Sequence, residues 1–262
     1  MMMKRASSFY PYFAGDERVT VDKMFSFYKK MSHGTQWLLT DFLDPGQRDI
    51  LKTIVGNDFF IQEDGGYEQA EKKRVYLSDR AIELSPADYR ITAFEIAYPV
   101  KFASLNHSAI LGTLANAGIE LATFGDIITD GKGRWQFFGK SELTDFFTDQ
   151  ITRVGRQQVK LKAVSSVLSP QDDGIEKTIV ASSLRLDKIL AESSGQSRSQ
   201  IKTALASNLV KLNWHGTKNS NIIVKVNDIL SVRYFGRVKV MKIETTKKNK
   251  YRVVLKLWQT KK

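Results

Sequence analysis

Arg185, Leu186 and Asp187 form an Arg-Leu-Asp triplet whose residue types can perform two different kinds of chemistry. An aspartate carboxylate can act as a nucleophile. An arginine can instead bind phosphate, because its planar guanidinium donates two parallel hydrogen bonds. Ser197 and Arg198 follow further along the chain and add a second arginine. The triplet therefore belongs either to an enzyme or to a protein that binds a polyanion.

Two short helices are expected to position these side chains. Apolar residues recur at helical spacing from Leu186 to Leu190, and Gly195 is suited to end that helix. A capping box begins at Ser197 and opens the second helix, and Asn208 follows where a left-handed backbone is needed. Beyond it, the pattern predicts strands over 209–214, 221–226 and 229–235 and a hairpin of 238–244 with 250–258.

Positive charge is concentrated in the last third of the chain. From Val180 to the end there are 18 Lys and Arg residues against 4 Asp and Glu residues, a net charge of +14. The residues before it carry a net charge of −2. A basic module attached to a nearly neutral body is typical of a protein that binds a polyanion, although a solvated lysine-rich surface gives the same count.

These residues together resemble the S-four domain, an RNA-binding module with an alpha-L motif that is named after a ribosomal protein. The resemblance rests on the Arg-Leu-Asp triplet, Ser197-Arg198, Val210, Leu212-Asn213 and Asp228-Ile229. Asn208 and Asn227 stand where that pattern usually has glycine, and asparagine tolerates the geometry that both positions require. The resemblance implies RNA binding.

Pseudouridine synthases supply the catalytic alternative, because their signature also contains Arg-Leu-Asp and uses the aspartate as the nucleophile. Their signature places Thr or Ser, any residue and Gly soon after the triplet, whereas Lys188-Ile189-Leu190 continues a helix here. We therefore expect Asp187 to be a hydrogen-bond or ion-pair partner, and we assign no catalytic residue.

The whole chain is predicted to be α+β, with an N-terminal α/β segment over 1–86. Residues 87–168 follow the order β-α-β-β-α-β of a ferredoxin-like, RRM-like domain. Residues 169–179 are a linker and a connecting strand, and residues 180–262 form the S-four-type domain.

Three local predictions precede the basic third. Apolar residues have helical spacing over 19–43, a short helix over 44–56 is capped by Asp44, and a further helix spans 141–155. Trp135, Phe137 and Phe138 are open to two interpretations, which are packing in the core and stacking on RNA bases.

Three stretches, 63–74, 101–128 and 224–240, together resemble the YlmH family of bacterial RNA-binding proteins, and the resemblance covers nearly the whole chain. It implies association with the large ribosomal subunit and transfer RNA, a part in ribosome quality control, and genes near those for cell division. The family usually reads His-Arg-Asp-x-Leu-Gly where residues 107–112 read His-Ser-Ala-Ile-Leu-Gly, so a role of that charged pair is not expected here.

The expected RNA contacts are Arg185, Lys188, Arg198, Ser199, Lys202, Lys211, Asn213, Arg233 and Arg237. Such side chains bind phosphates without reading sequence, so we expect recognition of shape in structured ribosomal or transfer RNA. Lys239 and Lys242 can extend this set, whereas Lys247, Lys248 and Lys250 are assigned to a solvated hairpin loop.

No cofactor or metal is expected, because cysteine is absent and the three histidines lie far apart in sequence. No apolar run approaches the roughly 18 residues of a membrane span, and the N-terminus lacks the apolar core of a signal peptide. We expect a cytoplasmic monomer that is not an enzyme. Two alternatives stay open, which are an RNA-modifying enzyme that docks through its S-four domain and a cell-division protein with an acidic or membrane partner.

Overall fold

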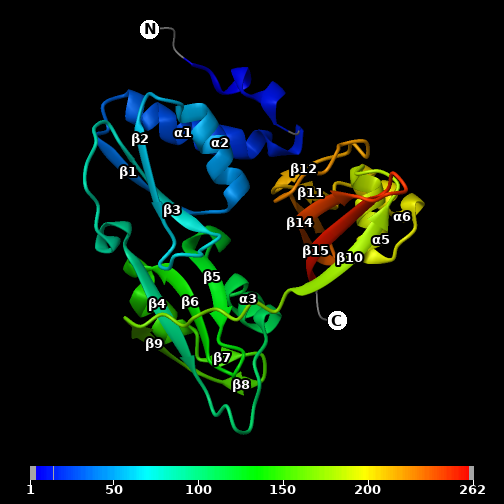
Figure 1. Ribbon diagram of the computed structural model, residues 1–262. Helices are drawn as coiled ribbons and strands as arrows, with labels where there is room; N and C mark the ends of the chain where they lie inside the picture. The colour runs from blue at the N-terminus through cyan, green and yellow to red at the C-terminus, as the bar shows by residue number, and fades with distance from the viewer. Residues whose placement is uncertain (1–3, 14, 260–262) are drawn as a thin grey trace. The chain divides into compact units, whose positions relative to one another are not determined.

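The computed structural model describes residues 4–13 and 15–259, which fall into two compact units (Figure 1). One unit comprises residues 23–171, and the other comprises residues 172–262 together with residues 1–22. Helix α1 (Arg18–Ser32) begins in one unit and ends in the other. Residues 1–3 and 260–262 lie outside the described residues. The first group belongs to the N-terminus for which no signal peptide is expected, and the second belongs to the predicted C-terminal domain.

The 23–171 unit begins with a small antiparallel sheet. Its strands are β1 (Trp37–Leu43), β2 (Phe60–Asp64) and β3 (Lys73–Ser78), in the order β1-β3-β2, and α2 (Pro45–Val55) connects the first two. The prediction of a helix from the apolar spacing over 19–43 is wrong for the second half of that range, where β1 forms. Helix α1 ends at Ser32, Gly34 takes a φ of 96°, and the following Trp, Thr and Phe favour a strand that pairs with β3.

Asp44 caps α2, as the sequence predicts. Its carboxylate accepts a hydrogen bond from the Gln47 N–H at 2.8 Å, and the Gln47 side chain accepts one from the Asp44 N–H at 2.9 Å. These bonds satisfy two donors that lack partners inside the helix. Replacing Asp44 with alanine should lower the free energy of unfolding by about 1 kcal/mol in urea denaturation, and an unchanged stability would contradict this role.

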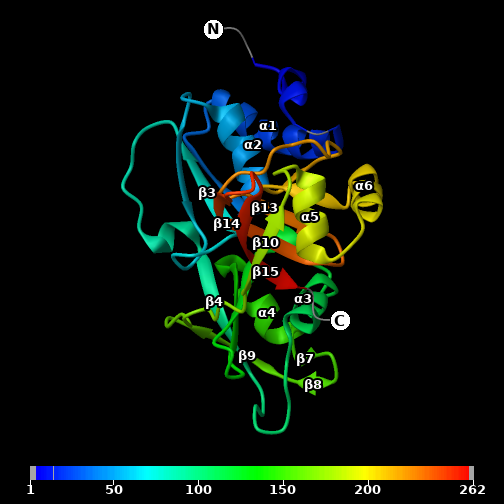
Figure 2. The same ribbon diagram turned by 45° about the vertical axis from the view of Figure 1, so that its right-hand side comes forward.

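The rest of this unit contains a four-stranded sheet and two helices whose elements follow the predicted order β-α-β-β-α-β. They are β4 (Ile91–Ala97), α3 (His107–Ala115), β5 (Phe124–Thr129), β6 (Trp135–Lys140), α4 (Thr144–Gln150) and β9 (Lys160–Val164). All neighbouring strands are antiparallel, in the order β5-β6-β4-β9. Helices α3 and α4 lie together beside this sheet (Figure 2).

The helix predicted over 141–155 is wrong beyond Gln150. The chain instead enters a hairpin of β7 (Arg153–Val154) and β8 (Gln157–Gln158), in which Gly155 has a φ of 57°. Ile151 and Val154 are both buried in the core, and their packing draws the chain away from the helical path. Gly155 therefore forms a turn between strands instead of ending a helix.

Both faces of the four-stranded sheet are covered by side chains of the same unit. Phe137 is fully buried in the core that includes α3 and α4. Phe138 is fully buried on the other face, where it packs with Phe42 of β1 and stacks on Tyr67 at 4.9 Å between ring centroids. Phe137 and Phe138 therefore belong to the core, and Trp135 is half-buried against it.

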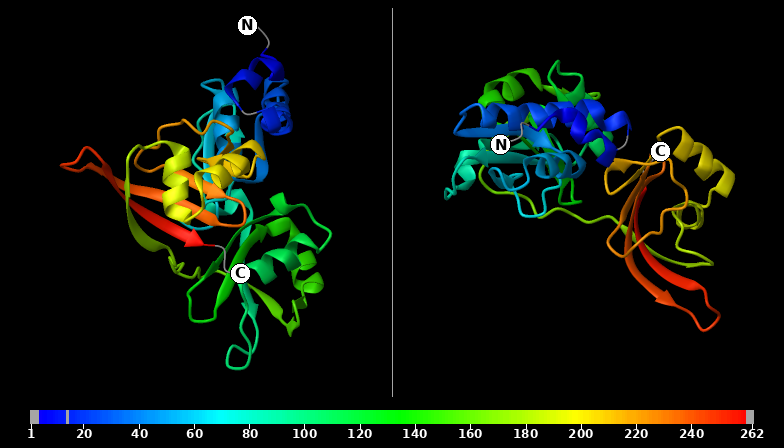
Figure 3. Two further views of the ribbon diagram at one scale, coloured as in Figure 1. Left: turned by 90° about the vertical axis from the view of Figure 1, so that its right-hand side faces the viewer. Right: turned by 90° about the horizontal axis from the view of Figure 1, so that it is seen from above.

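The C-terminal unit is a six-stranded antiparallel sheet that carries two helices on one face (Figure 3). Its elements are β10 (Ile175–Ala181), α5 (Leu186–Ser194), α6 (Arg198–Ala206), β11 (Val210–Leu212), β12 (His215–Gly216), β13 (Ile229–Val232), β14 (Gly236–Thr245) and β15 (Tyr251–Gln259). The strand order is β10-β15-β14-β13-β11-β12. Leu186, Ile189 and Leu205 of the helices are buried against the valines and leucines of the sheet.

Three strand predictions in this unit are wrong in part or in full. The strand expected over 229–235 ends at Val232, and residues 233–235 form a turn in which Tyr234 has a φ of 69°. The strand expected over 209–214 ends at Leu212, because Asn213 and Trp214 have φ values of 49° and 69° and make the turn to β12. Residues 221–226, all within the described part, form no strand, and Ile223 makes an isolated bridge to Arg185. Asn208 and Asn227 have φ values of 55° and 72°, which confirms their predicted geometry.

Short 3-10 helices complete the two units: Ala6–Ser8, Tyr10–Tyr12, Gly15–Glu17, Pro86–Tyr89, Leu121–Thr123 and Ser141–Leu143.

Candidate nucleic-acid interface

A buried carboxylate organises the surface where α5 and α6 begin. Asp187 is fully buried, and both of its oxygens accept hydrogen bonds from arginine. Arg185 donates from Nε to Oδ1 at 3.1 Å and from Nη2 to Oδ2 at 3.2 Å, and Arg198 donates from Nη2 to Oδ2 at 2.6 Å. The Arg185 and Arg198 side chains remain 34% and 50% exposed. One carboxylate thus fixes two cations beside each other at the surface.

The backbone around the triplet holds this arrangement in place. Arg185 is the residue immediately before α5, and Leu186 donates its N–H to the Ile222 carbonyl at 2.8 Å. Ser197 caps α6 through the Gln200 N–H, which makes Arg198 the first residue of that helix. Both arginines therefore lie at helix starts, and the prediction that Ser197 is a cap is confirmed.

Asp187 is ionised in this setting. Burial disfavours the charged form, but the hydrogen bonds from Arg185 and Arg198 outweigh burial and hold the pKa of Asp187 below its usual range. Its predicted role as an ion-pair partner is confirmed. A nucleophilic carboxylate must reach its substrate, whereas this one is enclosed and bonded through both oxygens.

Three more of the expected contacts lie on the same two helices. Lys188 of α5 pairs with Glu192 one turn later, at 2.7 Å. Ser199 and Lys202 are exposed on α6. Lys202 follows Arg198 by four residues, so the two share a face of the helix. Arg185, Lys188, Arg198, Ser199 and Lys202 are called the helix face below.

The remaining four expected contacts belong to the sheet and its turns. Lys211 is exposed on β11. Asn213 donates to Asp228 Oδ1 at 2.9 Å and accepts from the Ile229 N–H at 2.8 Å, so its amide closes a turn. The guanidinium carbon of Arg233 lies 5.2 Å from the Tyr234 ring centroid, and that of Arg237 lies 5.6 Å from the Trp214 centroid. The structure therefore divides the nine residues between the helix face and the sheet.

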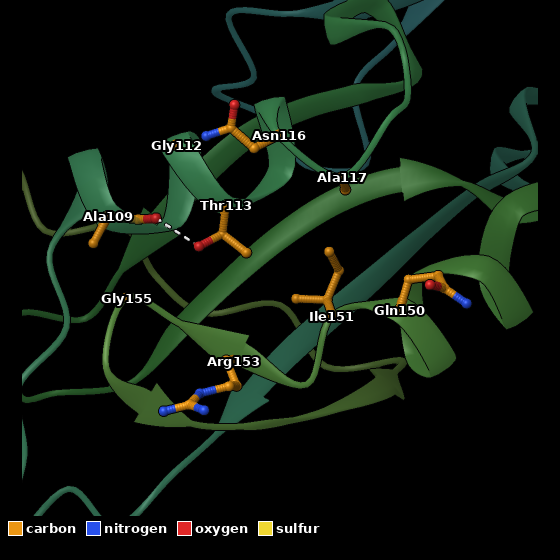
Figure 4. Close-up of a pocket in the computed structure, with 9 residues that line it drawn as sticks. All are labelled: Ala109, Gly112, Thr113, Asn116, Ala117, Gln150, Ile151, Arg153 and Gly155. Carbon is orange, nitrogen blue, oxygen red and sulfur yellow. Dashed lines mark hydrogen bonds between the residues drawn. The ribbon is translucent and has the colours of Figure 1, made fainter.

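The 23–171 unit has a shallow pocket between α3 and the β7–β8 hairpin (Figure 4). Neutral side chains line most of it, including Asn116 and Gln150, and Arg153 is the charged residue among them. The Thr113 hydroxyl is bonded to the Ala109 carbonyl of its own helix at 2.9 Å. No acid and base converge among these lining residues, so the pocket offers no acid–base chemistry.

A half-buried carboxylate of this unit, that of Asp126, has structural partners. Asp126 accepts hydrogen bonds from the backbone N–H groups of Glu71 and Lys72 at 2.7 and 3.2 Å and from the Tyr67 hydroxyl at 2.9 Å. Burial raises the pKa of Asp126, against the effect of these bonds. The carboxylate thus anchors the 63–74 stretch to β5. Among the described residues, no group of His, Asp and Glu could hold a metal ion.

Two cations of the sheet were missed by the sequence analysis, namely Arg252 and Lys256 of β15. Both alternate with buried Val253, Leu255 and Leu257, so they point away from the core. The alternating pattern of residues 252–257 is the signal that could have identified them.

The fold, charge and site of the C-terminal unit are those of an RNA-binding protein. The family model described as "Putative RNA-binding domain in YlmH" matches residues 85–167, and the S4 domain model, the S-four domain above, matches residues 184–230. No helix in the described part of the chain is long and apolar enough to cross a membrane.

The chain belongs to the YlmH family. It is 36% identical over 251 residues to ribosome-associated protein quality control protein P2 of Bacillus subtilis, and the match covers 94% of this chain and 97% of that protein. A solved structure, cell division protein ylmH from Streptococcus pneumoniae, is 31% identical with a TM-score of 0.50. That match covers 58% of this chain and 93% of the other. The resemblance to the family is thereby confirmed.

Proposed function

We propose that this protein is a ribosome quality-control factor that binds structured RNA of the large ribosomal subunit and a transfer RNA in stalled complexes. The observation that carries the proposal is the helix face, where Asp187 fixes Arg185 and Arg198 at the surface. The name of the Bacillus subtilis relative supports the ribosomal setting. The proposal implies a cytoplasmic protein, since ribosomes work there.

The contacts that we propose are the nine residues predicted from the sequence. On the helix face, the arginines are held in a fixed orientation by Asp187, so little side-chain entropy is lost when they bind phosphate. We also propose that the chain is a non-catalytic monomer. It acts through the four parts predicted from the sequence, with boundaries after residues 86, 168 and 179. The strand order β5-β6-β4-β9 supports a ferredoxin-like fold for the second part.

Arg198→Ala provides a direct test of the helix face. Removing one phosphate contact should reduce the slope of log affinity against log salt concentration by about one unit and weaken binding to bulk transfer RNA. The measurement is a titration of the full chain with transfer RNA at several salt concentrations. Arg80→Ala is a matched control, because Arg80 is an exposed arginine of the other unit. An Arg198 variant with the affinity and slope of the natural protein would remove this residue from the interface.

The name of the pneumococcal structure favours a second candidate, a protein linked to cell division. In that case the basic unit would meet an acidic protein partner, and binding would survive nuclease treatment of the complex.

A further inference from the structure

The second face of the six-stranded sheet carries neither helix, because α5 and α6 pack on the first. The inward side chains of β14 and β15, such as Val238, Val240 and Leu255, are fully buried. The residues that alternate with them are half-buried or exposed. These outward side chains are called the open face below.

Six cations lie on the open face: Lys211, Arg237, Lys239, Lys242, Arg252 and Lys256. Strand register brings them together across four strands. Ser231 pairs with both Lys211 and Arg237, and Lys239 pairs with Lys256. Cations two residues apart on one strand are about 7 Å from each other.

A β-bulge keeps one of these cations on the open face. The register of β14 and β15 shifts between Val240 and Lys242, with Met241 as the extra residue. Lys242 therefore lies opposite the outward Val254, and the next residue, Ile243, returns to the core. An extra residue of this kind re-aims the side chains that follow it.

Charge on the open face is unbalanced. Six cations stand against two acids from its strands. Glu176 lies opposite Lys256, and Glu244 lies opposite Arg252 and pairs with Lys242 at 2.7 Å. Lys239 and Lys256 lie directly opposite each other, and like charges in that position destabilise a sheet. An ion pair between Lys256 and Asp172 relieves part of this repulsion. The remaining positive charge is complementary to a polyanion.

Aromatic rings accompany two of the cations. Arg237 lies over Trp214, and Lys256 lies over Trp258, each 5.6 Å from the ring centroid. Cations beside aromatic rings on a sheet are the combination with which many proteins bind nucleic-acid backbones and unpaired bases. The S-four model ends at residue 230, so β14 and β15 lie outside the matched region.

We propose that the open face is a second RNA-binding surface, which contacts the phosphate backbone of the same RNA that the helix face binds. The proposal rests on the proposed RNA-binding function. RNA is the proposed partner, because a polyanion complements the net positive charge of the open face. The same unit also presents two oriented arginines on the helix face. An acidic protein is the alternative that the experiment separates.

The test is a triple variant, Lys239→Ala with Lys242→Ala and Arg252→Ala, titrated with bulk transfer RNA at several salt concentrations. Loss of three phosphate contacts should reduce the salt slope by about 2 to 3 units and weaken binding about tenfold. The control is Lys23→Ala with Lys29→Ala and Lys30→Ala, which removes the same charge from exposed positions of α1 in the other unit. Unchanged thermal unfolding of both variants would show that each is folded.

The outcomes separate this proposal from the function on which it rests. If the triple variant binds like the natural protein while Arg198→Ala weakens binding, the open face is not an RNA surface and the helix face stands. If both triple variants weaken binding equally, only net charge matters and the proposal is overturned. If the natural protein binds no RNA, the proposed function itself fails. Loss confined to the open-face variant would support the proposal.

Discussion

Replacing Asp187 with alanine is expected to destabilise the C-terminal unit by about 2 to 3 kcal/mol and to weaken RNA binding. Removing one partner of a buried ion pair commonly costs about 3 to 5 kcal/mol. The loss of stability is smaller here because Arg185 and Arg198 are partly exposed, so water can hydrate their guanidinium groups once the carboxylate is removed. The two guanidinium groups also lose the acceptor that fixes them, so the helix face binds RNA with a larger entropy loss.

Urea unfolding of the full chain and titration with transfer RNA measure the two effects. Asp173→Ala is a matched control, since Asp173 is an exposed aspartate between Asp172 and β10. If Asp187→Ala had the stability and affinity of that control, Asp187 would not organise the site.

The stabilising effect of Asp187 should also depend on pH. Because the folded pKa is depressed, its contribution is fully present above the unfolded value of about 3.9 and is lost as pH falls through the folded value. The stability difference between the natural protein and Asp187→Asn should therefore be constant near neutral pH and shrink in acid. A stability difference that grew as the pH was lowered would contradict a depressed pKa of Asp187 in the folded protein.

Replacing Arg74 with methionine is expected to destabilise the 23–171 unit by about 3 to 5 kcal/mol. Arg74 is 3% exposed, and its Nε donates to the Thr40 carbonyl at 2.8 Å. Its Nη1 donates to the carbonyls of Tyr89 and Arg90, each at 3.0 Å. Methionine fills much of the same volume but donates nothing, so these carbonyls lose their arginine donor. They belong to β1 and to the segment before β4, which Arg74 therefore joins.

Thermal and urea unfolding followed by tryptophan fluorescence can measure this loss, since Trp37 and Trp135 belong to the same unit. Arg80→Met is the matched control, because Arg80 is exposed two residues after β3. Equal stability of the two variants would show that the buried hydrogen bonds of Arg74 contribute nothing.

Helix ends that carry a capping residue could be predicted from the local sequence. Asp44 and Ser197 cap α2 and α6, and Gly195 follows α5 in the left-handed conformation. Predictions failed where tertiary packing outweighed spacing, as at β1 and at residues 151–155. Apolar residues at helical spacing do not reveal whether a sheet will pair with them, because pairing depends on residues distant in sequence.

The helix face could be predicted because Arg185, Asp187 and Arg198 lie close together in sequence and match a known pattern. Four cations of the open face were also expected to bind RNA, but their position on one face with Arg252 and Lys256 could not be predicted, because strand register alone brings them together. A one-residue change of register moves every side chain to the other face, and the bulge at Met241 is not evident from composition. The sequence therefore predicts the positive charge of this unit but not which side chains lie beside each other on the sheet.

Sedimentation of the tagged protein from a bacterial lysate through a sucrose gradient, with and without RNase, tests the central claim most directly. We expect co-migration with large ribosomal subunits that RNase abolishes. Replacing Arg185 and Arg198 together with alanine should also abolish it. A natural protein that stayed at the top of the gradient would contradict the account of a ribosome-bound factor.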